Sequence, residues 1–139
     1  TAPRSVTEGA ILARSSNPPQ TPTGPRGLAR FREQDISFAS RGTFQGATEV
    51  WRTRVFLLSK AQTVGYGAIA CVHVTASIRE CWGTYTLPRG LIRVAGQVMN
   101  RRSFKVFVVG GSGIYAHAEG TLAANGTADV RALVFNFGS

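Results

Sequence analysis

Nine residues between positions 69 and 117 combine side chains that bind or transform small organic molecules. An imidazole transfers protons near neutral pH, a phenol donates a hydrogen bond, and a guanidinium stabilises a developing negative charge. The candidate catalytic residues are therefore His73, Tyr85, Arg93 and Tyr115. Other side chains close to them in sequence could contact the substrate, namely Ile69, Cys71, Trp82, Gln97 and His117.

The orientation of these candidates depends on strand parity, because alternate residues of a β-strand face opposite sides. If Cys71 points into the protein, Ile69 and His73 point inward with it, and His73 becomes an interior acid or base. Arg93 and Gln97 share one face of their segment. An inward Arg93 would bind a carboxylate or an enolate, whereas an outward Arg93 is a solvated arginine.

Tyr115, His117 and Glu119 also share one face if their segment is a strand. Facing inward, they would offer hydrogen bonds and a titratable group to a bound carbonyl. The opposite parity places them in solvent and turns small apolar residues inward. Trp82 and Tyr85 could equally serve a structural role in place of substrate contact, since large aromatic side chains often form barrel core or an interface.

The two cysteines, Cys71 and Cys81, are too few for a closed zinc site, and His73 does not complete a ligand motif with them. We therefore expect no metal and no organic cofactor. The cysteines form one disulfide if their strands place them on a shared face, which the sequence leaves open.

Residues 1–10 lack the basic start and long apolar core of a signal peptide, which slightly favours a cytoplasmic over a secreted location.

The composition is that of a basic globular domain. The 139 residues carry 16 basic and seven acidic side chains, a net charge of +9, and 14 of the basic residues are arginine. Such a balance favours contact with anions, but the arginines are scattered and only Arg101 and Arg102 are adjacent. We expect a solvated basic surface and no dedicated nucleic-acid interface. No apolar run approaches the roughly 20 residues of a membrane-spanning helix, so no membrane partner is expected.

Proline content separates an arm from a body. Five of the six prolines fall within the first 25 residues, which predicts an extended arm over residues 1–30 and one folded domain over residues 31–139. From Phe31 onward, segments rich in β-branched and aromatic residues alternate with glycine-containing turns. They predict strands at 36–44, 47–58, 65–75, 79–87, 91–99, 104–109, 115–123 and 128–137. Eight strands with short turns favour an all-β fold, an eight-stranded antiparallel up-and-down β-barrel, which is just wide enough to hold one small ligand.

Three segments of the predicted barrel resemble a known group of proteins. The run VVGGSGIYAHAEG at residues 108–120 resembles the V-V-G-G-[TS]-G-[IV]-F-x-x-A-x-G signature shared by plant dirigent proteins and allene oxide cyclases. The run GAIACV at 67–72 is similar to the cysteine-bearing strand of allene oxide cyclases, and residues 84–87 and 91–97 are similar to the two strands that follow it. The resemblance implies a barrel that binds an apolar or aromatic intermediate and steers its ring closure or coupling without a cofactor. It further implies a bacterial cyclase type of the kind found in polyketide pathways.

The first strand departs from the pattern of allene oxide cyclases. Arg30 and Arg32 stand where those enzymes have a Glu and an Asn, although Glu33 and Asp35 match later acidic positions. In dirigent proteins an Arg follows the aromatic residue of the glycine motif, and here Ala116 takes that place. Neither parent activity is therefore expected unchanged.

Three functions remain open. We expect an enzyme first, a cofactor-independent cyclase or isomerase that folds an apolar, polyketide-like substrate into a reactive conformer inside the barrel. The second hypothesis is a non-enzymatic dirigent-like protein that steers stereoselective coupling of radicals formed elsewhere. The third is a basic nucleic-acid-binding module. The expected partners are an apolar small molecule and further copies of the chain, in a dimer or a trimer.

Overall fold

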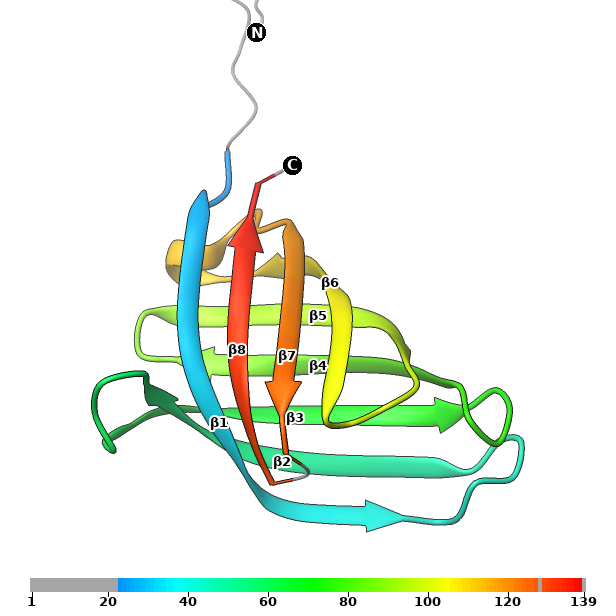
Figure 1. The fold of residues 1–139 in the computed structure, drawn as a ribbon. Helices are drawn as coiled ribbons and strands as arrows, with labels where there is room; N and C mark the ends of the chain where they lie inside the picture. The colour runs from blue at the N-terminus through cyan, green and yellow to red at the C-terminus, as the bar shows by residue number, and fades with distance from the viewer. Residues whose placement is uncertain (1–22, 128, 139) are drawn as a thin grey trace, which may run out of the picture.

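The computed structural model describes residues 23–127 and 129–138, which form a closed barrel of eight antiparallel strands (Figure 1). Each strand pairs with the next one in sequence, and the last pairs with the first. The strands are β1 (Gly27–Ser40), β2 (Thr48–Leu57), β3 (Thr63–His73), β4 (Arg79–Leu87), β5 (Gly90–Val98), β6 (Ser103–Gly111), β7 (Gly120–Gly126) and β8 (Val130–Phe137), with a short 3-10 helix, η1 (Gly113–Tyr115), after β6. The predicted eight-stranded β-barrel is confirmed.

Strand β1 joins the two halves of the barrel. Its first part pairs with β8 and its second part with β2, and the register shifts between Asp35 and Ser37. Such a bulge bends a strand and increases its twist. Figure 1 shows the result: β1 curves from the direction of β7 and β8 into the crossing direction of β2, β3 and β4.

The backbone ladder of the barrel is shortest between β5 and β6. Backbone pairing joins only Ile92–Ala95 to Phe107–Gly111, so the second half of β5 and the first half of β6 separate. Apolar side chains, among them Val98, Phe104 and Val106, line the gap and leave no room for a water molecule. We refer to this place as the β5–β6 seam.

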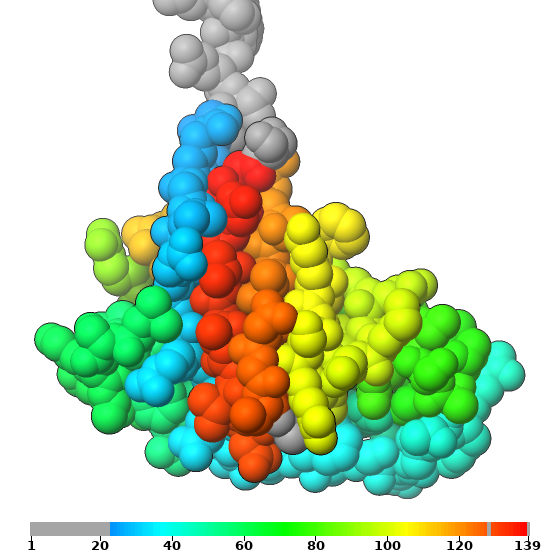
Figure 2. Space-filling model, viewed as in Figure 1, coloured from blue at the N-terminus to red at the C-terminus, as the bar shows by residue number. Residues whose placement is uncertain are grey.

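The barrel interior is filled by the chain's own side chains. Alternation along β2 buries Trp51 and Val55 and exposes the residues between them. Tyr85 packs edge-on against Phe135, with ring centroids 5.5 Å apart, and Phe135 stacks on Phe137. Figure 2 shows that side chains also close the surface between β1, β8 and β7 on the face in view.

Two predicted strand starts are wrong by several residues. The first strand begins at Gly27, inside the predicted arm, because its exposed arginines alternate with inward residues that include a buried carboxylate, Glu33, and this pattern reads as polar. Tyr115 belongs to η1 instead of a strand, and β7 begins only at Gly120. The rest of the predicted arm, residues 1–22, lies outside the described residues. Within the described ranges there is no helix long and apolar enough to cross a membrane.

Gly67 tests the packing of the interior. A Cβ at this position would lie 2.5 Å from Thr53 Oγ1 and 2.8 Å from Tyr85 Cε1, and both side chains are buried. We expect Gly67→Ala to lower the free energy of unfolding by about 1–3 kcal/mol through overpacking. Ala68→Val, at the neighbouring outward position, should change it by less than about 0.5 kcal/mol. Urea unfolding measures both effects. Equal losses of stability would contradict the inward position of Gly67 and the outward position of Ala68 on β3.

Candidate functional site

Four charged side chains meet at one end of the barrel interior. Glu33 and Asp35 extend from β1, Arg131 from β8, and Arg101 from the loop between β5 and β6. Arg131 Nε donates to Glu33 Oε2 at 2.8 Å, and Arg131 Nη2 donates to Asp35, which also accepts from Arg101. Glu33 and Arg131 are fully buried. We call this set the central ion cluster, and its two carboxylates are balanced by its two guanidinium groups.

Tyr85 adjoins the central ion cluster as an uncharged hydrogen-bond donor. Its hydroxyl donates a long hydrogen bond, 3.4 Å, to Glu33 Oε1. Burial, and next the negative charge of Glu33, raises the pKa of Tyr85 well above its ordinary value of 10, while the positive charge of Arg131 opposes the shift. The phenol therefore keeps its proton throughout the physiological pH range. It supports Glu33 and does not act as a base.

Next to this cluster, three buried polar atoms have no hydrogen-bond partner within the described part of the chain: Trp51 Nε1, Thr53 Oγ1 and Arg101 Nε. An unsatisfied buried donor costs about 1–3 kcal/mol, so such atoms require a reason. The Trp51 ring lies between Phe38 and Phe104, at centroid distances of 6.5 and 6.4 Å. Two aromatic rings thus flank Trp51, whose indole N–H is left to bond a ligand.

Arg101 covers this aromatic group. Its guanidinium carbon lies 3.9 Å from the centroid of Phe38 and 5.1 Å from the ring of Trp51. The contacts combine cation–π attraction with the ion pair to Asp35. Arg101 lies at the end of the barrel that carries the loops β1–β2, β3–β4, β5–β6 and β7–β8, which we call the Arg101 end.

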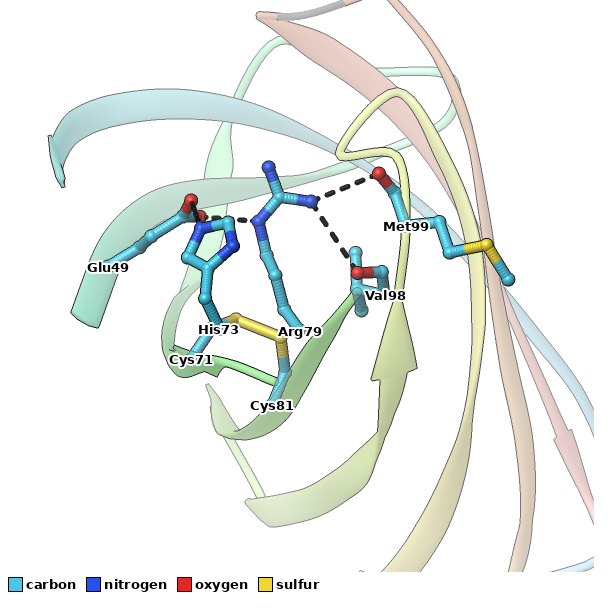
Figure 3. The surroundings of a disulfide bond; sticks show 7 residues. All are labelled: Glu49, Cys71, His73, Arg79, Cys81, Val98 and Met99. Atoms are coloured by element: carbon cyan, nitrogen blue, oxygen red, sulfur yellow. Dashed lines mark hydrogen bonds and ion pairs between the residues drawn. A yellow bond between two sulfur atoms is a disulfide. The ribbon is translucent and has the colours of Figure 1, made fainter. Parts of the chain in front are cut away.

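A second polar group lies beside a disulfide at the same end (Figure 3). His73 Nε2 lies 2.7 Å from Glu49 Oε1, and His73 Nδ1 lies 3.1 Å from the carbonyl oxygen of Thr75. Arg79 Nε donates to Glu49 Oε2 at 2.8 Å, and Arg79 Nη1 donates to the carbonyl oxygen of Met99 at 3.1 Å. Both ring nitrogens of His73 are occupied, so the group ties β2, β3, β4 and the end of β5 together.

The disulfide joins Cys71 on β3 to Cys81 on β4, which pair directly across the two strands with their Cα atoms 4.1 Å apart. The sequence left this pairing open, and the shared inward face of the two positions explains it. Both side chains are buried in the barrel core. The described residues contain no further cysteine and no group of three or more His, Cys, Asp or Glu side chains that could hold a metal ion.

The structure brings four of the nine predicted site residues into the interior, namely Ile69, Cys71, His73 and Tyr85. Cys71 is bonded to Cys81, and His73 and Tyr85 are bonded to carboxylates. These residues therefore line and hold the interior. None of the polar ones has a free atom directed at a ligand in this structure.

The other predicted site residues lie outside the lumen. Arg93 and Gln97 occupy the outer face of β5, because Val94 and Val98 take the inward positions. Trp82 is outward on β4 and 53% exposed. For these three residues, interior substrate contact is excluded by their parity.

The glycine motif does not place its polar residues on one strand face. His117 is exposed in the loop that precedes β7, so the shared face assumed for Tyr115, His117 and Glu119 does not exist. Tyr115 is half-buried and stacks on Phe137 at 5.8 Å, at the end of the barrel opposite Arg101. His117 has a φ of 62°, a left-handed conformation that is uncommon outside glycine.

Sequence reasoning missed most of the interior polar residues. Glu49 and Thr53 share the parity of Trp51 on β2, and this alternation could have indicated them. Glu33 and Asp35 were recognised only as matches to acidic positions of a resembling family. Arg30 and Arg32, which replace that family's Glu and Asn, point outward and do not disturb the interior.

No protein-family model and no curated protein matches the chain. Solved structures match its fold. Pyocyanin demethylase has a TM-score of 0.72 at 20% identity and covers 80% of this chain and 99% of its own. A pterocarpan synthase dirigent protein has a TM-score of 0.64 at 11% identity over 89% of this chain and 96% of its own. The exo-specific intermolecular Diels-Alderase AbnU has a TM-score of 0.62 at 10% identity over 82% and 98%.

The chain has the barrel fold of dirigent proteins and Diels-Alderases. The expected architecture is therefore confirmed by the coordinates and by these comparisons together. At identities of 10–20%, the likeness establishes the fold alone. The function has to be argued from the interior and from the surface of this chain.

Tyr85 should make the stability of the protein sensitive to alkaline pH. Its pKa is raised in the folded state, so its contribution is complete below about pH 10 and is lost as the pH rises towards the folded-state pKa. The free energy of unfolding should fall by up to about 1.4 kcal/mol per pH unit for this group. Tyr85→Phe should remove that part of the slope and leave the part due to Tyr115, whose pKa burial also raises. Urea unfolding between about pH 9 and 11 measures both slopes, and equal slopes would contradict the assignment.

Proposed function

We propose that the barrel interior binds a flat, mostly apolar small molecule with a carbonyl or hydroxyl oxygen and acts on it as a cofactor-independent cyclase or isomerase. The observation that carries this proposal is the unsatisfied indole nitrogen of Trp51, fully buried between Phe38 and Phe104 and next to the unsatisfied hydroxyl of Thr53. A ligand oxygen would satisfy these atoms, and its apolar body would replace the contacts of the surrounding rings. The expected polyketide-like substrate has this chemistry.

The ligand needs space that the side chains occupy in this structure, and Arg101 supplies the means of opening it. Arg101 lies in the loop that joins β5 to β6, at the β5–β6 seam. The backbone hydrogen-bond ladder between the two strands does not extend to this loop. Phe38 is already 45% exposed, so rotating the Arg101 side chain outward uncovers chiefly the Trp51 ring, and it breaks one ion pair to Asp35. Asp35 keeps its bond to Arg131, so its charge stays compensated.

The chemistry available at this position is orientation and electrostatic stabilisation. The Trp51 N–H and the Arg101 guanidinium can donate to a substrate oxygen and stabilise negative charge that develops on it. The aromatic walls can hold a flexible chain in a folded conformer, which lowers the entropic part of the barrier to ring closure. Tyr85 and His73 become positioning residues in this proposal, because carboxylates already occupy their polar atoms.

The comparisons support a small-molecule function over the nucleic-acid hypothesis. The solved structures with this fold are named for the demethylation of pyocyanin, pterocarpan synthesis and a Diels-Alder reaction. Disulfides persist in oxidising compartments, so the bond between Cys71 and Cys81 supports a secreted over a cytoplasmic location of the protein. The homo-oligomer stays a prediction, and the exposed Trp82 and Phe107 on the outer wall would be available to it.

Trp51→Phe tests the proposed site, since it keeps an aromatic ring and removes the N–H. We use pyocyanin, a flat aromatic compound that bears one oxygen, as the binding probe in calorimetry. The substitution should weaken binding about tenfold, the value of one hydrogen bond of about 1.4 kcal/mol. The same substitution should slow the cyclisation of an acyclic triene with a carbonyl-bearing dienophile by a similar factor.

The matched control is Trp82→Phe, which removes the same N–H from the outer surface and should change neither binding nor rate. Arg101→Ala should accelerate binding of the probe, because it removes the side chain that covers Trp51. Equal affinities of the Trp51 and Trp82 variants would contradict the interior site. A cyclisation rate equal to that without protein, for every triene offered, would contradict the cyclase.

A specific observation also favours the dirigent-like alternative. Among the described residues, every carboxylate and imidazole in the interior has a partner, namely Glu33, Asp35, Glu49 and His73. A barrel without a free acid or base could orient radicals and leave the chemistry to an external oxidant.

The two functions differ in their need for that oxidant. A dirigent-like protein should leave a phenol such as coniferyl alcohol unchanged by itself and should give an excess of one coupling enantiomer when a one-electron oxidant is added. A racemic product under the same conditions would exclude this alternative. Chiral chromatography of the coupled product measures the excess directly.

A further inference from the structure

We propose that the protein has a second binding site, a groove on the outside of the barrel that takes a small carboxylate with an apolar body. The groove has a volume of about 630 Å³ and lies at the end of the barrel opposite Arg101, outside the proposed cyclase site. It runs between residues 23–26, the outer face of β5 and β6, and the loop before β7. Its lining residues include Arg26, Arg93, Val109, Gly110, His117 and Glu119. We call it the anion groove.

Two arginines face the anion groove from different segments. Arg93 extends from β5 over Gly110, where an added Cβ would lie 3.9 Å from Arg93 Nη1. Arg26 extends from the chain before β1 over Gly138, where an added Cβ would lie 3.4 Å from Arg26 Nη1. Neither guanidinium has a hydrogen bond or an ion pair in the described part of the chain, in contrast to Arg79, Arg101 and Arg131. Such groups can bind a carboxylate through charge-assisted, bidentate hydrogen bonds.

The charges around the anion groove favour an anion. Arg26 and Arg93 are accompanied by one imidazole, that of His117, and by one carboxylate, that of Glu119. The net charge of the whole chain is +9, so the long-range field attracts anions to the surface. Glu119 limits the preference to a ligand with a single negative group, because a second one would approach its carboxylate.

The rest of the lining accepts an apolar body. Val109 is 58% exposed there, and the remaining uncharged wall is glycine backbone with the side chains of Thr23, Pro25, Ala116 and Ala118. Gly110, with a φ of 155°, leaves the space beneath Arg93 open. A volume of this size fits a small molecule and is too small for a folded partner.

The backbone of the loop before β7 is held in the shape that the groove requires. His117 keeps its left-handed conformation, and Gly24 packs so closely against the His117 carbonyl that a Cβ at position 24 would overlap it. A non-glycine residue in this conformation costs of order 1 kcal/mol or more, which surrounding structure has to offset. The glycine motif thus builds the wall of a groove in addition to the turn after β6.

Binding of 2-naphthoate to the full chain, measured by calorimetry, tests this proposal. The neutral 2-naphthamide has the same rings and separates the contribution of the charge. We expect naphthoate to bind about tenfold or more tightly than naphthamide, and the double variant R26Q/R93Q to remove that difference.

The matched control is R30Q/R32Q, which removes the same charge from two exposed arginines on the outer face of β1 and should change the affinity by less than about twofold. Both probes also fit the proposed interior site, so the readout of the anion groove is the difference in affinity between naphthoate and naphthamide. Trp51→Phe should leave that difference unchanged, so that failure of this site and failure of the cyclase site are distinguishable. Equal losses in the two double variants would overturn the proposal in favour of a general effect of charge. Equal affinities for naphthoate and naphthamide, or no binding of naphthoate, would overturn it as well.

Discussion

The structure depends on the ion pair between Glu33 on the first strand and Arg131 on the last, which are 98 residues apart in sequence and fully buried. Removing either charge from water costs several kcal/mol, which the opposite charge and the further bonds from Tyr85 to Glu33 and from Arg131 to Asp35 compensate. The pair can form only when β1 and β8 lie in the observed register, in which Glu33 stands opposite Arg131. An open or shifted sheet would leave one buried charge without its counterpart. The charges in the interior are therefore neutralised only when the barrel closes in this register.

That requirement extends to the loop at the Arg101 end. A second carboxylate, Asp35, follows on the same face of β1, and Arg131 shares its charge with both acids. Arg101 completes the balance, and in doing so it is drawn across Phe38 and Trp51. The side chain that neutralises the interior is thus also the side chain that lies over the ring of Trp51. A cover held by one ion pair and two ring contacts can rotate away at moderate cost, because Asp35 retains Arg131.

The architecture followed from the sequence, whereas the site largely did not. Turn spacing and alternation predicted eight strands, and on β3 the inward parity of Cys71 correctly carried Ile69 and His73 with it. Parity alone cannot distinguish the inside from the outside, so Arg93 was left with two orientations until Val94 and Val98 were seen to take the interior. Ion pairs between residues as distant as Glu33 and Arg131 have no local signal. The start of β1 was missed because its inward positions hold a small residue, Ala29, then Phe31 and then an acid, Glu33, between exposed arginines, which gives only a weak hydrophobic pattern.

The pairing of acids in the interior also determines the character of the outer surface. Three of the seven acidic residues, Glu33, Asp35 and Glu49, are matched inside by Arg131, Arg101 and Arg79. These charges cancel, so the whole net charge of +9 belongs to the rest of the chain, where arginines outnumber the acids that could pair with them. Unpaired arginines such as Arg26 and Arg93 are the consequence. Because these carboxylates pair with arginines in the interior, they cannot pair with arginines on the outer surface. Those outer arginines can then bind anions from solution.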